Sequence, residues 1–209
     1  MDSAAWDARY AGADLVWSVG PNAFVAEVVG PMTPGRALDI AAGEGRNALW
    51  LAEQGWDATS ADFSPVAVER AQDIAAERLD GGVGAGPFRA VVADALAPAP
   101  APTTGGGYDL VLFAYLQLPD ADWRVALRHG VAAARPGGSV LVVCHAERNL
   151  AEGVGGPQDA AVLHDPEAVV AAVADLPVEV VSAELRERPV DGADRPALDS
   201  VVLFRRLES

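Results

Sequence analysis

Short apolar runs rich in valine alternate along the chain with longer stretches in which apolar residues recur at helical spacing, and glycine and proline separate the two. The continuous runs predict buried β-strands, and the amphipathic stretches predict helices. The predicted strands are 36–41, 57–62, 88–93, 108–114, 139–144, 178–186 and 197–206. The predicted helices are 46–54, 65–79, 120–133 and 165–175, and residues 1–30 are expected to form a helical extension.

The order of these elements predicts an α/β fold. Alternation of strands and helices is typical of a parallel sheet with helices on both faces. No helix separates the last two strands, so we expect them to pair as an antiparallel hairpin. We expect one domain over residues 1–209, with 1–30 as an N-terminal helical lid and 31–209 as the core.

The segments between the elements are rich in glycine, proline and alanine. We expect loops at 80–87 and 95–107 and a turn at 135–138, where the sequence reads Arg-Pro-Gly-Gly. The loop 149–164 is long, and loops above about 12 residues in compact domains are usually functional or disordered. This loop is therefore a candidate part of a binding site.

Composition excludes several kinds of chemistry. The chain has 209 residues and one cysteine, Cys144, which rules out a disulfide framework within the chain and a multi-cysteine zinc site. All 15 basic residues are arginine, so lysine-based catalysis is excluded. The net charge of −15 repels phosphate backbones and anionic membranes. Neither a signal peptide nor a run of 18 apolar residues is found, so we expect a cytoplasmic protein without nucleic-acid or membrane partners.

The segment 38–47 is the most informative part of the chain, because a glycine loop there joins the first strand to the first helix. Gly43 and Gly45 allow the backbone to approach a ligand closely. Asp62 ends the second strand, 17 residues after Gly45, where a carboxylate can accept both ribose hydroxyls. Residues 43–48 satisfy a relaxed dinucleotide fingerprint, but Asp39 suits a ligand with a cationic amino-acid moiety better than a pyrophosphate.

Several motifs, taken in this order, resemble those of the class I S-adenosylmethionine-dependent methyltransferases. They are Asp39-x-x-x-Gly43-x-Gly45, Asp62, Ala93-Asp94-Ala95, Tyr108-Asp109-Leu110-Val111 and Arg135-Pro136-Gly137-Gly138. The resemblance implies a Rossmann-like seven-stranded sheet with its last strand antiparallel. It also implies that the cofactor is S-adenosylmethionine, leaving as S-adenosylhomocysteine. The cofactor-binding residues that it implies are Asp39, Ala41, Gly43, Gly45, Arg46, Asn47, Asp62, Phe63, Ser64, Asp94, Ala95 and Phe113.

The N-terminal segment resembles that of the methyltransferase subgroup that includes the tellurite-resistance and thiopurine enzymes. The similar residues are Trp6-Asp7-x-Arg9-Tyr10 and Trp17-Ser18-x-Gly20-Pro21-Asn22. In that subgroup this segment closes over the methionine end of the cofactor, which implies contacts from Trp17 and Asn22. Trp6 and Tyr10 lie four residues apart and could equally be core anchors.

His145 is the candidate general base, because it follows the fifth strand directly, at the edge where the methyl acceptor is expected. An imidazole titrates near neutral pH and can take a proton from a hydroxyl acceptor. Glu147 is the rival base, and Tyr115, Arg148 and His164 are candidate substrate contacts. His145, Glu147, Asp159 and His164 could also collect a divalent cation, but their spacing is not diagnostic and we predict no metal.

The acceptor is expected to be a small hydroxylated molecule, since no strongly basic pocket is evident in the sequence. Composition, His145 and the tryptophan-rich N-terminus are similar to those of mycobacterial enzymes that 1-O-methylate the sugars of methylmannose polysaccharide, so a sugar hydroxyl ranks first. A thiol, phenol or oxyanion acceptor, an NAD(P)-dependent oxidoreductase and a non-catalytic cofactor-binding protein are the alternatives. A homodimer is a further open alternative.

Overall fold

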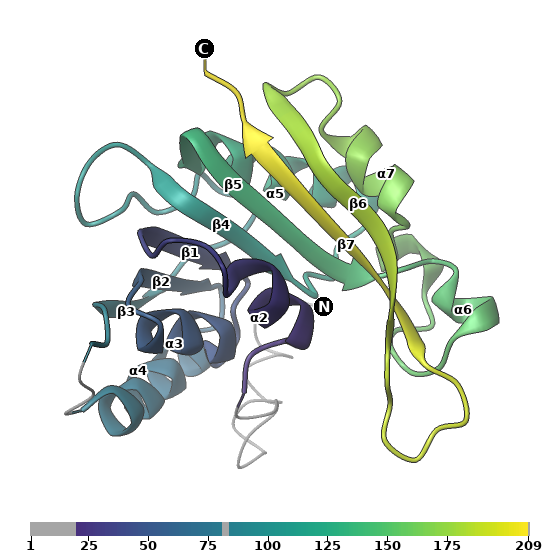
Figure 1. The fold of residues 1–209 in the computed structure, drawn as a ribbon, viewed down its shortest axis with the longest axis horizontal. Helices are drawn as coiled ribbons and strands as arrows, with labels where there is room; N and C mark the ends of the chain where they lie inside the picture. Colours follow the sequence, from purple (N-terminus) through teal and green to yellow (C-terminus); the bar gives the residue numbers. More distant parts are fainter. Residues whose placement is uncertain (1–19, 81–83, 209) are drawn as a thin grey trace.

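A computed structural model of the chain describes residues 20–80 and 84–208 (Figure 1). Most of the predicted N-terminal lid, including Trp6, Tyr10 and Trp17, lies outside these residues. The described part of the lid contributes one short helix, α2 (Ala23–Val29). The Asn22 side chain caps this helix by accepting hydrogen bonds from the backbone N–H groups of Phe24 and Val25.

Seven strands form one sheet in the order β3-β2-β1-β4-β5-β7-β6. They are β1 (Arg36–Ile40), β2 (Asp57–Asp62), β3 (Phe88–Val92), β4 (Tyr108–Ala114), β5 (Ala134–His145), β6 (Val178–Arg188) and β7 (Ala197–Arg206). Strands β1 to β5 run parallel, whereas β7 is antiparallel to both β5 and β6. The predicted α/β fold with a reversed last strand is therefore confirmed.

Helices cover both faces of the sheet (Figure 1). One face carries α2, α3 (Arg46–Glu53) and α4 (Pro65–Leu79). The other face carries α5 (Asp120–Ala133) and α7 (Pro166–Ala172). Ser64 and Pro65 begin α4 as predicted, since the Ser64 hydroxyl accepts from the N–H of Ala67 and proline occupies the first turn.

The period-two alternation of the strands divides the core into two layers. Leu38, Val111 and Val142 point toward α5, whereas Ala37, Leu112 and Val143 point toward α2 and α3. The same alternation places His145 on the α2/α3 side of the sheet with Val143, and Cys144 on the α5 side with Val142.

Two segments differ from the sequence-based expectation. The strand predicted from residue 139 begins at Ala134, because Ala134 already pairs with Tyr108 before the predicted turn 135–138 interrupts the register and Ser139 resumes it opposite Leu110. The loop 149–164 contains a short helix, α6 (Asn149–Glu152), and a 3-10 turn, η1 (Ala160–Val162). Within residues 20–80 and 84–208, no helix has the length and apolar character needed to cross a bilayer.

Gly130 shows how closely α5 packs on the sheet. A Cβ atom at this position would lie 2.5 Å from two ring atoms of Phe113. The Phe113 ring is itself fully buried and packs edge-on against Trp123, with ring centroids 6.1 Å apart.

We predict that Gly130→Ala lowers the free energy of unfolding by about 1–2 kcal/mol, because overpacking of a rigid site outweighs the better helix propensity of alanine. Gly105→Ala is the control, since a Cβ there meets no atom within 4 Å. Urea denaturation of both variants measures the effect. Equal stability of the two variants would show that the Phe113 ring can move aside.

Candidate active site

The loop between β1 and α3 is built from residues in left-handed conformation. Ala41, Gly43 and Gly45 have φ angles of 56°, 57° and 78°. A Cβ on Gly45 would lie 3.2 Å from Ser60 Oγ and 3.3 Å from Ala71 Cβ, so glycine also allows α3 to start close to β2 and α4. This tight turn lies at the carboxyl end of β1, where open α/β sheets bind their ligands.

Asp62 ties this loop to the end of β2. Its buried carboxylate accepts hydrogen bonds from the backbone N–H groups of Gly43 (2.8 Å) and Ser64 (2.9 Å). The neighbouring Glu44 is also buried and forms an ion pair with Arg70 on α4 at 3.0 Å. The acidic residues of this region therefore hold the loop in shape.

Asp39 is different, because its carboxylate is buried and the nearby donors, the Ala48 N–H and the Asn47 side chain, do not reach it with normal hydrogen-bond geometry. It is 1% exposed, and neither of its oxygens makes a hydrogen bond that meets normal geometry with the described residues. Burial raises the pKa of Asp39 to about 7, although the nearby Arg46 guanidinium opposes the shift. An orphaned buried carboxylate beside a glycine loop fits a ligand that brings its own positive charge.

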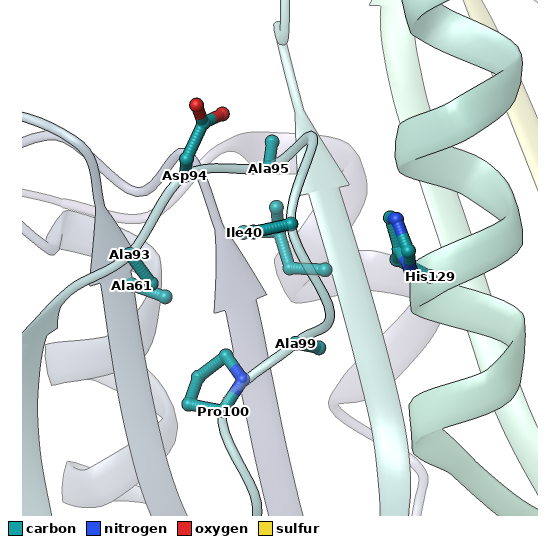
Figure 2. A pocket seen from close by; sticks show the side chains of 9 residues that line it. Ile40, Ala61, Ala93, Asp94, Ala95, Ala99, Pro100 and His129 are labelled. Atoms are coloured by element: carbon teal, nitrogen blue, oxygen red, sulfur yellow. The ribbon is translucent and has the colours of Figure 1, made fainter.

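The segment after β3 borders a small hollow on the α5 side of the sheet (Figure 2). The Asp94 carboxylate is directed away from this hollow, whereas His129 faces it from α5. One oxygen of Asp94 accepts from the N–H of Leu96 at 2.9 Å. The residues that line the hollow are Ile40, Ala61, Ala93, Asp94, Ala95, Ala97, Ala99, Pro100 and His129.

His145 ends β5 and lies opposite Asp199 of β7 in the antiparallel pairing. Its Nδ1 is 3.0 Å from Asp199 Oδ1, while Asp199 Oδ2 accepts from the Tyr115 hydroxyl and from Arg188 Nε, each at 2.7 Å. Asp199 is fully buried, which alone would raise its pKa. Hydrogen bonds from His145, Arg188 and Tyr115 outweigh burial and hold that pKa below its usual range.

An ionised carboxylate only accepts hydrogen bonds, so Nδ1 of His145 carries the proton in this pair. Nε2 is then the basic nitrogen, and it makes no hydrogen bond with the residues that the structure describes. The His145 side chain keeps 13% of its surface exposed. A histidine held in this way can receive a proton from a bound molecule.

Tyr115 links this cluster to the N-terminal side of the molecule. Its hydroxyl accepts from Asn22 Nδ2 at 3.1 Å, and its ring stacks on His145 with centroids 4.5 Å apart. The backbone N–H of Asn22 donates to Asn47 Oδ1 at the start of α3. The base candidate and the glycine loop are thus connected through a short chain of polar contacts on one face of the sheet.

Other predicted site residues lie elsewhere. Phe113 is in the core against Trp123, Phe63 is half-buried, and Glu147 is exposed. Arg148 forms surface ion pairs with Asp165 and Glu167.

His164 is buried, with its ring stacked on Trp123 and its Nε2 3.3 Å from the carbonyl oxygen of Leu118. Burial lowers the pKa of this histidine. The structure therefore does not bring its imidazole to that of His145. Asp159 accepts from the N–H of Ala161, and the described residues contain no cluster of three His, Cys, Asp or Glu side chains that could hold a metal.

Asp199 and Arg188 are the functional candidates that sequence reasoning missed. The signal for Asp199 was the pair Asp199-Ser200, which interrupts an otherwise apolar strand that is buried along most of its length. Buried polar residues within a strand need partners, and those partners are only visible once β7 is paired with β5.

Comparison with known proteins identifies the class to which this arrangement belongs. Residues 37–138 match the family model for a methyltransferase domain, Methyltransf_25. Hemagglutinin 1 from Eikenella corrodens is 34% identical over 120 residues, which make up 57% of this chain and 37% of that protein. The chain thus spans little more than a third of the length of this curated relative.

Solved structures show the same fold. A structure concerned with the conversion of a disulfide bond into a thioacetal group during echinomycin biosynthesis superposes with a TM-score of 0.74 and 24% identity, over 98% of this chain and 91% of that one. The N-methyltransferase NodS from Bradyrhizobium japonicum WM9, in complex with S-adenosyl-L-homocysteine, gives 0.71 and 18% over the whole of both chains. TehB from Haemophilus influenzae gives 0.67 and 16% over 90% of this chain and 63% of that one.

Residues 37–138 are thus similar in sequence to a methyltransferase domain, and the seven-stranded sheet has the fold of solved methyltransferase structures. NodS, one of the solved structures with this fold, holds S-adenosyl-L-homocysteine, the product that S-adenosylmethionine leaves after methyl transfer. The orphaned Asp39 carboxylate and the close-packed glycine loop are features that fit this cofactor, which carries an ammonium group.

We predict that Asp39→Asn stabilises the cofactor-free protein increasingly as pH rises. The raised pKa means that folded Asp39 keeps its proton above pH 4 while the unfolded chain loses it, so the parent loses stability between about pH 4 and pH 7. At about 1.36 kcal/mol per pKa unit, the advantage of asparagine should grow by about 2–3 kcal/mol between pH 5 and pH 8. Urea denaturation at both pH values measures it.

Asp73→Asn on the exposed face of α4 serves as the control and should show no such growth. An Asp39→Asn advantage that is equal at pH 5 and pH 8 would mean that Asp39 is ionised in the folded protein throughout this range.

Proposed function

We propose that the protein transfers a methyl group to a small hydroxylated acceptor and that His145 is the general base. The observation that carries the proposal is the contact of His145 Nδ1 with the buried Asp199 carboxylate at 3.0 Å. This contact leaves Nε2 as a proton acceptor at the carboxyl end of β5, on the same face of the sheet as Asp39. A positioned base of this kind contributes roughly 10²–10⁴-fold to a proton-transfer step.

The cofactor would be held along the carboxyl ends of the first strands. Asp39 would receive its ammonium group, the loop 41–47 would contact its amino-acid portion, and Asp62 would accept from the ribose hydroxyls. The segments 63–64 and 94–95 would border its adenine, and Asn22 would close the methionine end together with Trp17. When bound, this cofactor would supply a methyl group attached to a cationic sulfur. An acceptor oxygen would attack the methyl carbon in line with the carbon–sulfur bond, and the sulfur would leave.

His145 takes the acceptor's proton as the oxygen becomes the nucleophile. The proton passes from the acceptor O–H to Nε2, and the imidazolium that forms is stabilised by the Asp199 carboxylate. Arg188 and Tyr115 keep that carboxylate ionised and in place, because their hydrogen bonds hold its pKa down. The chain thus provides a path for the proton that a neutral hydroxyl acceptor must lose.

A sugar hydroxyl is the acceptor class that we rank first, with a methylated mannoside as its leading member. Arg148 is paired on the surface and Arg188 is paired with Asp199, so neither offers an unpaired charge to an anionic acceptor. An oxyanion acceptor needs no proton removal, and a dinucleotide brings no ammonium group to the buried Asp39. These two points favour a neutral hydroxyl over the alternatives.

We predict that Asp62→Ala weakens binding of S-adenosylhomocysteine by about 1–3 kcal/mol, because the ribose hydroxyls and the Gly43 N–H lose their acceptor. Isothermal titration calorimetry measures the affinity, with Asp73→Ala as the control. NADH should bind neither variant nor parent. Unchanged affinity in Asp62→Ala would place the ribose elsewhere.

We predict that His145→Ala lowers kcat by roughly two to four orders of magnitude and leaves affinity for S-adenosylhomocysteine nearly unchanged. Methyl transfer to a panel of methyl mannosides, other sugars, phenols and thiols is the assay.

The same change at Glu147 tests the rival base. A large loss in Glu147→Ala with full activity in His145→Ala would transfer the role to Glu147. Turnover confined to thiols or oxyanions would refute the hydroxyl acceptor, and cofactor binding without turnover on any acceptor would support a non-catalytic protein.

A further inference from the structure

The hydrogen bond to Asp199 fixes one ring nitrogen of His145 but not the plane of the ring. Rotation about the bond that joins a histidine ring to its Cβ is broad and has no sharply staggered wells. A single contact at Nδ1 therefore leaves the ring able to rock and Nε2 able to swing. Groups that pack on the faces of the imidazole must set its orientation.

Tyr115 is one such group. Its ring lies at 29° to the imidazole, and its hydroxyl is held by Asn22 and Asp199. Its backbone φ is 61°, a left-handed value that is uncommon for a bulky residue. Strain of this kind persists where the surrounding structure enforces it, and it clusters at functional sites.

Gly156 is the other group, and it comes from the loop 149–164. A Cβ at Gly156 would lie 3.3–3.4 Å from Nδ1, Cε1 and Cγ of His145, so this position of the loop faces the ring and leaves little room for a side chain. Its φ of 74° also favours glycine. Any larger residue would press on the imidazole.

The loop that carries Gly156 is fixed in place by Asn149. This buried side chain accepts from the N–H of Leu198 at 2.7 Å and donates to the carbonyl of Gly155 at 2.9 Å. The loop is thereby attached to β7 next to Asp199. The loop is therefore held at a fixed position beside the imidazole.

We propose that Tyr115 and Gly156 are positioning residues that hold the plane of the His145 ring, so that Nε2 stays aimed at the acceptor. The proposal rests on the proposed role of His145 as the base. It adds that the loop 149–164 acts through the shape of its backbone at Gly156 and that the stacked tyrosine acts through its ring and hydroxyl together.

The chain offers a matched pair for the test. Gly155 has a φ of 68°, close to that of Gly156, but a Cβ there meets no atom within 4 Å. Alanine at either position meets the same backbone strain, and only Gly156→Ala presses on the imidazole. We expect Gly155→Ala to keep kcat within about twofold of the parent, and Gly156→Ala to lower kcat by roughly 10–100-fold with the KM for S-adenosylmethionine unchanged.

Nitrogen-15 NMR of the His145 ring provides a readout that does not depend on turnover. The parent should show Nδ1 protonated and Nε2 unprotonated in the neutral ring, and so should Gly155→Ala. Gly156→Ala should show a mixture of the two tautomers, and Tyr115→Phe, which keeps the ring stack and loses the hydroxyl, should fall between them. Thermal unfolding of the two alanine variants checks that their stabilities match.

The outcomes separate this proposal from the one on which it rests. Identical ring spectra and identical kcat in Gly155→Ala and Gly156→Ala would overturn the positioning role. Altered spectra in Gly156→Ala, combined with full activity in His145→Ala, would keep the positioning role for the ring and refute its role as the base.

Discussion

The buried carboxylate of Asp199 is the constraint around which the surroundings of His145 are organised. Burial of a carboxylate is costly unless charged or polar donors surround it. Three donors do so here, from the end of β5, from the residue after β4 and from β6. Because those donors come from separate segments, one ion fixes the relative positions of β4, β5, β6 and β7 at this edge. The tyrosine and histidine that pack against each other are held by the same group.

The placement of the glycine loop beside Asp62 could be predicted from sequence because its signals are local. The glycine loop, Asp39 and Asp62 lie within 24 residues, each at a strand end that the apolar pattern already marks. The strand and helix order was predictable for the same reason. The start of β5 was predicted too late because an irregularity inside a paired strand, at 135–138, has the same composition as a turn between elements.

The surroundings of His145 could be predicted only in part. His145 was identifiable from its place after a strand, but Asp199 and Arg188 are 54 and 43 residues away in sequence. Their contact depends on the register of an antiparallel pair, which no local pattern reports. His164 was a candidate substrate contact because it lies in the loop that was expected to cover the site, yet its side chain enters the core against Trp123. Two residues at the ends of one loop need not share a site when the sheet they flank has two faces.

The family match also divides the chain into a part that it covers and a C-terminal part that it does not cover. The family match ends at residue 138, before the strand segment that carries His145 and before Gly156, Arg188 and Asp199. The part of the chain that matches the family model therefore contains most of the residues proposed to hold the cofactor. Under the proposed function, the residues that would select the acceptor lie in the last third of the chain, outside the matched region. Grouping of relatives by acceptor should accordingly compare the residues that face His145 across β5 and β7, rather than the region that unites the family.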